Sequence, residues 1–367
     1  MQKNRELEVL RAIGISFVVM AHLPYLLPVF PEWIKVLNKY MTFWPGVDLF
    51  FVVSGFVITR SLKKQIAESD KEIFWRGIFA FWARRFYRLI PASWFWLAMS
   101  IVLAVALPQY NYFLSVSGNV RDAVAQFFHV ENWHFYYCMN GLTECGTNGR
   151  YWSLSLEEQF YVALPFAIYF LRRHLALFCV VLIAIQFPIE RPLNTLLWFS
   201  RIDAMLWGVI IALCFDKALF QAAKPMLLSR LAPRLVIGGG LIISLPILAT
   251  GLIAPFYTGM IALASAIIVW IASYDSGLMF KHIKNSPVVL WMGSRSYSLY
   301  LIHGMTFRIV THFTRLVLDR DLTGDDSLFI GLTALVLSAI LADLSYRFLE
   351  VPFIRRGRLV SSGAEAK

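Results

Sequence analysis

Residues 9–23, VLRAIGISFVVMAHL, form an apolar run that contains one arginine, Arg11, and one histidine, His22. Eleven helical steps of about 100° return the second side chain to within about 20° of the first, with a rise of about 16 Å. Both side chains therefore project from one stripe of a helix. An ionisable group inside an apolar span is costly and indicates a function. The alternatives are an arginine that extends to the membrane boundary and a histidine that packs against a neighbouring helix.

The composition of the chain is that of a multi-pass membrane protein. Of the 367 residues, 58% are hydrophobic and 16% are charged, whereas soluble domains carry about 25% charged residues. Apolar runs of about 20 residues can span a bilayer, and they recur along the chain. We predict an all-α protein with about ten transmembrane helices, at residues 9–28, 43–62, 89–107, 152–171, 175–188, 195–215, 235–253, 255–274, 288–311 and 328–349.

The formal charge of +11 is distributed unevenly along the chain. With the N-terminus in the cytoplasm, the segments RSLKKQ, FWARRFYR, LRRH, SRLAPR and IRRGR all fall on the cytoplasmic side, as the positive-inside rule predicts. This excess indicates anchoring to anionic lipid and argues against a nucleic-acid partner. An even number of spans returns the C-terminus to the cytoplasm. We expect residues 1–355 to form one transmembrane domain and residues 356–367 to form a disordered cytoplasmic tail.

The longest predicted outer loop, residues 108–151, contains Cys138 and Cys145 in the segment CMNGLTEC. An oxidising compartment would allow these cysteines to form a disulfide, and two free thiols are the alternative. We expect the disulfide, because the charge distribution independently places both cysteines outside. The same loop carries His129, Trp133 and His134, whose rings could stack on a ligand, and a loop that simply caps the bundle is the alternative.

Acidic residues occur in later spans at a depth similar to that of His22. Asp48 lies about 18 Å from the predicted inner boundary, where it could orient a histidine base or form a purely structural polar pair. Glu157 and Glu158 lie in the outer half of the fourth run. Because adjacent residues on a helix point about 100° apart, we expect only one of them to face the bundle interior.

Further polar residues in the sixth and ninth runs predict a polar cavity through the bundle. A channel, a transporter and an intramembrane enzyme could each contain such a cavity. The residues concerned are Arg201, Asp203, Arg295, Tyr297, Tyr300 and His303.

The segment FWARRFYRLIP favours an enzyme that binds a phosphorylated ligand. Arg85 and Arg88 are three residues apart on a helix, so their guanidinium groups can converge. Paired arginines suit phosphate oxygens, although anchoring at the inner membrane face is the alternative. The chain has no glycine-rich phosphate loop and no Cys/His cluster with zinc spacing. We therefore expect neither an NTPase nor a bound metal.

The motifs, in this order, resemble the acyltransferase-3 family of bacterial inner-membrane O-acyltransferases. They are R-x10-H at Arg11 and His22, GVDLFFVVSGFVIT, R-x-x-R at Arg85 and Arg88, YWSLSLEEQFY, RIDAMLWG, SYSLYLIH and FLEVPF. The resemblance extends over nearly the whole chain. It implies transfer of an acyl group, most often acetyl, from acyl-CoA to a hydroxyl of a surface polysaccharide, lipopolysaccharide O-antigen or other glycan. Some relatives carry an additional periplasmic hydrolase-like domain, and we expect a stand-alone form without one.

This resemblance assigns expected roles to the polar residues. His22 would be a general base or a covalent acyl carrier, oriented by Asp48 or Glu157. Acetyl-CoA would enter from the cytoplasm and bind Arg11, Arg85 and Arg88. The glycan would approach from outside, where the expected contacts are Glu158, Tyr297, Tyr300 and His303.

Two other classes of protein remain open. A proton-coupled transporter of a lipid-linked sugar or small anion would also need buried His, Asp and Glu, but it would not need an arginine pair suited to a nucleotide phosphate. An enzyme of the unrelated membrane-bound O-acyltransferase family would pair Asn and His on separate segments. The sequence does not display that pairing.

Overall fold

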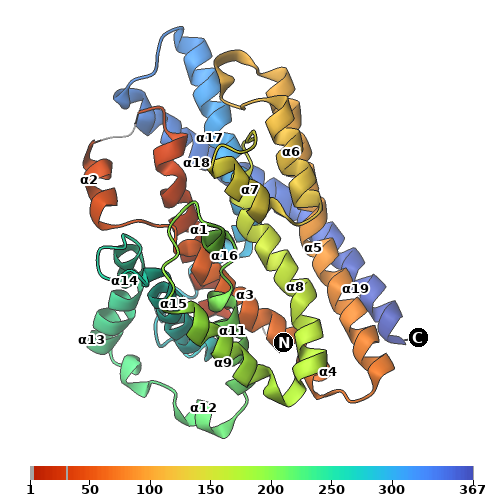
Figure 1. The fold of residues 1–367 in the computed structure, drawn as a ribbon. Coiled ribbons are helices and arrows are strands. Elements are labelled where there is room, and N and C mark those ends of the chain that lie inside the picture. The colour runs from red at the N-terminus through yellow and green to blue at the C-terminus, as the bar shows by residue number, and fades with distance from the viewer. Residues whose placement is uncertain (1–3, 30–31, 367) are drawn as a thin grey trace.

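Helices account for most of the computed structural model, which describes residues 4–29 and 32–366 (Figure 1). No strand occurs in these two described ranges. The helices of the first half are α1 (Arg5–Leu26), α2 (Glu32–Tyr40), α3 (Gly46–Ser61), α4 (Lys63–Ala67), α5 (Lys71–Ala106), α6 (Val116–Phe127), α7 (Glu131–Met139), α8 (Trp152–Leu171) and α9 (Leu175–Gln186). Those of the second half are α10 (Leu196–Phe199), α11 (Asp203–Cys214), α12 (Ala218–Ala222), α13 (Leu231–Pro233), α14 (Gly239–Leu248), α15 (Tyr257–Ser273), α16 (Pro287–Ser294), α17 (Ser296–Leu318), α18 (Gly324–Ser345) and α19 (Val351–Ala366).

The length and composition of the helices confirm a multi-pass membrane architecture. Each of the ten predicted apolar runs contains helix, but several of these helices, such as α3 and α9, are short. The number of spans and the sidedness of the termini therefore stay predictions. The segments of the described chain that are long and apolar enough to cross a membrane are Arg5–Leu26, Lys71–Ala106, Gly149–Gln186, Leu196–Cys214, Leu231–Leu248 and Gly324–Ser362.

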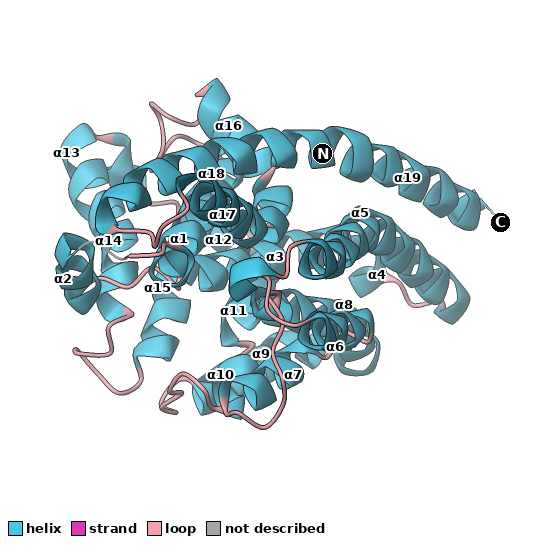
Figure 2. Cartoon of the chain, turned by 90° about the horizontal axis from the view of Figure 1, so that it is seen from above, coloured by secondary structure: helices cyan, strands magenta, loops and turns pink. Residues whose placement is uncertain are grey.

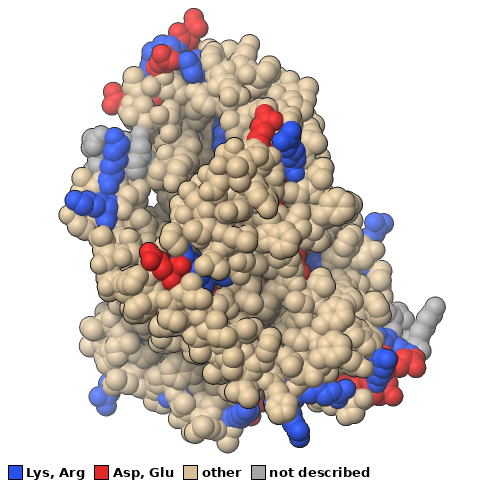
Figure 3. Space-filling view, in the orientation of Figure 1, with Lys and Arg blue, Asp and Glu red and all other residues tan. Residues whose placement is uncertain are grey.

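The charged side chains on the surface are distributed as expected for a membrane protein. Figure 3 shows Lys and Arg side chains gathered along the lower rim of one face, with further charges at its upper end. Most of the surface between them is uncharged. Both chain ends lie in the lower half of the same view (Figure 1).

The N-terminal helix α1 is held by polar contacts at its start and packs against α3, α16 and α17. The Asn4 side chain accepts a hydrogen bond from the backbone N–H of Leu7 at 2.9 Å, which caps a helix end that would otherwise leave donors unsatisfied. Glu6 is fully buried and accepts hydrogen bonds from the backbone N–H groups of Gly277, Met279 and Phe280 at 3.0–3.2 Å. These contacts fix the height of α1, and therefore of Arg11 and His22, in the bundle.

The C-terminal segment differs from the prediction of a disordered tail at residues 356–367. Helix α19 continues to Ala366, and Lys367 lies outside the described residues. A π-helical turn at Tyr346–Glu350 joins it to α18. The helix is ordered because it packs along α5 (Figure 2), and Ser361 near its end is buried.

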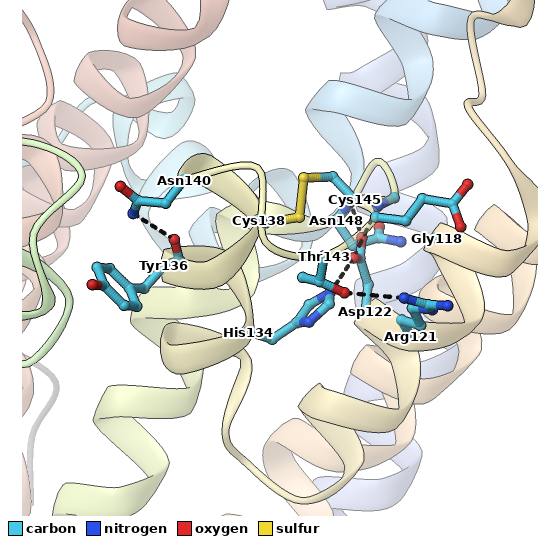
Figure 4. The surroundings of a disulfide bond; sticks show 12 residues. Gly118, Arg121, Asp122, His134, Tyr136, Cys138, Asn140, Thr143, Cys145 and Asn148 are labelled. Atoms are coloured by element: carbon cyan, nitrogen blue, oxygen red, sulfur yellow. Dashed lines mark hydrogen bonds and ion pairs between the residues drawn. A yellow bond between two sulfur atoms is a disulfide. The ribbon is translucent and has the colours of Figure 1, made fainter.

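The predicted outer loop is compact and contains α6 and α7. Cys138 and Cys145 are joined in a disulfide that links the end of α7 to the segment before α8 (Figure 4). Asp122 on α6 accepts hydrogen bonds from the backbone N–H groups of Gly146 and Asn148 at 3.0 and 2.8 Å. His134 on α7 donates to the same carboxylate at 3.2 Å. This polar centre ties both helices to the entrance of α8.

The closest helix contact in the core joins α3 and α11. A Cβ atom at Gly55 would lie 2.1 Å from the carbonyl oxygen of Met205, and one at Gly208 would lie 2.3 Å from the carbonyl oxygen of Val52. Only glycine allows this approach, which is common where membrane helices pack closely.

We therefore predict that Gly55→Ala lowers the melting temperature of the detergent-purified protein. Overpacking of this kind costs about 1–3 kcal/mol. The matched control is Gly240→Ala on α14, where an added Cβ meets no heavy atom within 4 Å. Thermal unfolding checks both variants, and equal melting temperatures for the two would contradict the close packing of α3 on α11.

Candidate active site

Two neighbouring cavities contain most of the polar residues that the sequence singled out. The first, which we call the arginine pocket, has a volume of about 110 Å³. Its polar lining consists of Arg11, Ser54, Arg85, Arg88, Ser153, Glu157, Tyr161, Ser296, Tyr297 and Tyr300. The pocket thus collects side chains from α1, α3, α5, α8 and α17, and it brings all three predicted donor-binding arginines together.

A hydrogen-bonded carboxylate lies among the cations of the arginine pocket. Glu157 accepts hydrogen bonds from the hydroxyl groups of Ser54 and Tyr161. The guanidinium carbon of Arg85 lies 5.4 Å from the ring centroid of Tyr161. Arg11 forms an ion pair with Glu8 at 2.5 Å. The pocket therefore has a net positive lining that is suited to an anionic ligand.

The second cavity, which we call the histidine cavity, is larger, at about 700 Å³. Val47 lines both cavities, so they are adjacent. The aromatic part of its lining includes Tyr25, Phe43, Trp44, Phe135, Trp152, Trp198, Phe199 and Tyr257, and the polar part includes His22, Asn38, Lys39, Thr42, Thr147, Arg150, Arg201, Thr250, His303 and Arg308.

Two histidines from different helices meet in this cavity. The ring centroids of His22 on α1 and His303 on α17 lie 5.1 Å apart. His22 Nδ1 is 2.7 Å from the carbonyl oxygen of Val18, and His303 Nδ1 is 3.0 Å from that of Leu299. Because a carbonyl oxygen only accepts, both Nδ1 atoms carry the proton. Each Nε2 is left with a free lone pair, and that of His303 is buried without a partner among the described residues.

Asp48 does not orient His22, which corrects one prediction. Arg201 donates from Nε to Asp48 Oδ1 at 3.1 Å and from Nη2 to Oδ2 at 3.0 Å, and both side chains are fully buried. Glu157 does not orient His22 either, because it lines the arginine pocket and is held by Ser54. The backbone carbonyl of Val18 takes that role.

The two adjacent glutamates diverge as the helical geometry predicts, but Glu158 is not where an acceptor contact was expected. It is buried outside both cavities and accepts hydrogen bonds from Gln126 at 2.8 Å and His129 at 2.6 Å. This contact raises the pKa of His129 above its ordinary value. Glu158 therefore attaches α8 to the outer segment.

The two tyrosines of α17 line the arginine pocket and hold neighbouring helices. Tyr297 donates to the carbonyl oxygen of Leu89 at 2.7 Å. The Tyr300 hydroxyl donates to the carbonyl oxygen of Arg150 and lies 2.6 Å from the Ser153 hydroxyl. Tyr300 therefore forms part of the wall between the two cavities, because Arg150 lines the histidine cavity.

Several residues of the site were missed by the sequence analysis. Ser54 and Tyr161 are uncharged and therefore gave no signal of a buried charge in the sequence. Arg308 belongs to none of the motifs that the sequence analysis recognised. Arg150 directly precedes the motif YWSLSLEEQFY, and this position was the available signal. The sequence analysis treated the tryptophans around Arg201 only as part of the hydrophobic composition of the chain.

The comparisons with known proteins agree with this geometry. The model of the acyltransferase domain family matches residues 4–346. The O-acetyltransferase OatA of Staphylococcus aureus strain NCTC 8325 is 28% identical over 337 residues, which cover 85% of this chain and 53% of the relative. The peptidoglycan O-acetyltransferase OatA of Listeria monocytogenes is 28% identical over 380 residues, which cover 95% of this chain and 55% of the relative. No solved structure matches significantly.

The extent of these matches defines what they show. The chain spans about half the length of the curated relatives it matches. The family model, in contrast, covers nearly all of the chain, including the arginine pocket and both histidines. The chain belongs to the acyltransferase-3 family.

Proposed function

We propose that this protein is a membrane O-acetyltransferase that moves an acetyl group from acetyl-CoA to a hydroxyl of a cell-surface glycan. The observation that carries the proposal is the pair of histidines with free Nε2 atoms beside a pocket lined by three arginines. The similar proteins from S. aureus and L. monocytogenes are named O-acetyltransferases, and the latter is named for peptidoglycan.

The donor binds at the arginine pocket. Coenzyme A carries several phosphate charges, and guanidinium groups bind phosphate oxygens with paired hydrogen bonds. Arg85 and Arg88 lie one helical turn apart on α5, and Arg11 faces them from α1. The pocket is too small for the whole coenzyme, so it receives the phosphates or the start of the pantetheine arm, and the arm directs the thioester toward Val47 and the histidine cavity.

The acceptor binds in the histidine cavity. Its volume lies within the range of about 300–1,000 Å³ that is usual for ligand sites. Trp44, Trp198 and Tyr257 are part of its lining, and such aromatic side chains suit contact with the apolar faces of sugar rings. The acceptor hydroxyl lies next to His22 Nε2 in this arrangement.

His22 acts as the general base. Its Nε2 takes the proton of the acceptor hydroxyl while the hydroxyl oxygen attacks the thioester carbonyl carbon. The tetrahedral intermediate then expels the coenzyme A thiolate, and this sulfur takes up a proton as the ester is released. The ring centroid of His303 lies 5.1 Å from that of His22, so His303 offers a second acceptor for the transferred proton.

The protein resides in a bacterial inner membrane, with the donor on the cytoplasmic side and the acceptor outside. The support for this sidedness is the concentration of Lys and Arg in the segments expected to be cytoplasmic. Transfer through adjoining cavities moves only an acetyl group toward the acceptor and leaves the strongly charged coenzyme where it binds.

The first test concerns His22. We predict that His22→Ala lowers kcat for acetyl transfer by about 10²–10⁴-fold, the usual contribution of a general base, while the protein stays folded and inserted. His282→Ala is the matched control, because His282 is exposed and lies outside both cavities. Measurement of coenzyme A thiol release checks both variants.

The same assay separates the two roles open to this histidine. Full activity in a well-expressed His22→Ala protein would remove His22 from the mechanism. Radiolabelled acetyl that stays on the wild-type protein in the absence of acceptor, and that is missing from His22→Ala, would instead indicate a covalent acetyl-histidine.

The second test concerns the donor site. We predict that Arg85→Gln combined with Arg88→Gln weakens coenzyme A binding at least tenfold, because a hydrogen bond to a charged group contributes about 1.5–3 kcal/mol. Arg76→Gln is the control on the same helix, where Arg76 is paired with Glu72 at 2.7 Å, away from both cavities. Isothermal titration with coenzyme A makes the comparison, and an unchanged affinity in the double variant would reduce the pair to a membrane anchor.

The third test concerns sidedness. In sealed inside-out vesicles, labelled acetyl-CoA added to the exposed cytoplasmic face is expected to label an acceptor in the lumen. The same donor added outside right-side-out vesicles is expected to label nothing, because coenzyme A does not cross lipid. Equal labelling in the two preparations would show that the donor site is accessible from the wrong side.

A further inference from the structure

The charged side chains that line the histidine cavity all have the same sign. Lys39, Arg150, Arg201 and Arg308 are part of its lining, and no Asp or Glu is among the described residues that line it. The charge of Arg201 is balanced by Asp48, with which it forms an ion pair. The charges of the other three cations are left to be balanced by something else.

Arg150 is buried and Arg308 is half-buried, and the hydrogen bonds of both guanidinium groups go to backbone carbonyl oxygens. The Arg150 guanidinium carbon also lies 5.5 Å from the ring centroid of Tyr151. Arg150 is 8% exposed and donates to the carbonyl oxygens of Thr147 and Leu301 at 2.8 and 2.7 Å. Arg308 donates to the carbonyl oxygen of Tyr112 at 2.5 Å. The Nε atom of each is buried without a partner, and neither forms an ion pair within the described part of the chain.

Arg308 belongs to α17, and the guanidinium group of Arg150 packs against the same helix next to His303. A Cβ atom at Gly304 would lie 2.8 Å from Arg150 Nη1, so this glycine leaves room for the guanidinium directly beside His303. Arg308 follows Gly304 by one helical turn, which is a rise of about 6 Å. The positive charges of Arg150 and Arg308 repel one another. The fold therefore places two like charges in the lining of the cavity that also contains His22 and His303.

A cation that is buried without a counter-ion destabilises a protein, and within a membrane bundle such groups mark functional sites. Guanidinium forks match the paired oxygens of carboxylates and phosphates. The missing negative charge is therefore best supplied by the ligand that occupies the cavity during turnover.

We infer that the acceptor is an anionic glycan, which carries a carboxylate or phosphate within about one sugar residue of the hydroxyl that is acetylated. Arg150 and Arg308 bind that anionic group, and Lys39, which is exposed at the edge of the cavity, attracts it. This inference rests on the proposed function for the identity of the ligand, but not for its charge.

Binding of matched sugars to the detergent-purified full-length protein tests the inference. The probes are trigalacturonic acid, its carboxyl-reduced neutral form, and the neutral form phosphorylated at one terminal residue. We expect the acidic sugars to bind at least tenfold more tightly than the neutral one, as one charge-assisted hydrogen bond provides. The carboxylate and phosphate arms identify which anion the arginines prefer.

Variants locate the effect in the cavity. Arg308→Gln is expected to abolish the preference for the acidic sugars, and Arg308→Lys is expected to retain part of it. Arg315→Gln is the control on the same helix, where Arg315 pairs with Asp321 outside the cavity. The wild-type comparison stands by itself if Arg308→Gln does not fold.

Three results would overturn the inference: equal binding of acidic and neutral sugars, no binding of any of them, or a loss of coenzyme A affinity in Arg308→Gln that assigns these cations to the donor. Acetyl transfer is measured separately by thiol release. A retained preference for acidic sugars without transfer to any acceptor would count against the proposed function alone.

Discussion

The buried ion pair between Asp48 and Arg201 is the interaction on which the rest of the site depends. It joins α3 to the segment between α10 and α11, and the Arg201 guanidinium carbon also lies 5.2, 5.0 and 4.2 Å from the ring centroids of Trp44, Trp152 and Trp198. Removal of one partner of a buried pair costs about 3–5 kcal/mol, because the other charge stays uncompensated. The pair therefore fixes one wall of the histidine cavity and the orientation of the aromatic rings around it.

With Asp48 engaged in this pair, the histidines are oriented by neutral groups. His22 and His303 each donate from Nδ1 to the carbonyl oxygen four residues earlier on their own helix. Such a carbonyl fixes the tautomer and leaves Nε2 basic, and it adds no further charge to a region where burial of charge is costly. A carboxylate beside His22 would also attract the cations of the cavity wall. The neutral arrangement leaves Arg150 available to a ligand.

The helices and the family could be predicted from the sequence, because both depend on local patterns. Apolar runs predicted helices throughout the bundle, and the ordered motifs predicted the family that the comparisons show. The prediction of a disordered tail at 356–367 did not include the packing of α19 along α5, because this is a contact between distant parts of the chain. The short helix α3 also depends on a distant contact, because Gly55 on α3 and Gly208 on α11 allow the two helices to pack closely.

For the candidate site, the sequence could predict only where each residue lies along its own helix. Helical geometry gives the position of a residue along its own helix and the direction of its side chain relative to its neighbours, so the divergence of Glu157 from Glu158 was predictable. Rise does not determine which neighbouring helix a side chain faces. Asp48 faces Arg201, which lies just before α11, and His22 instead meets His303, which lies 281 positions later in the chain. A residue's partner across a bundle depends on the rotation and tilt of both helices, and these are set by packing that involves the whole chain.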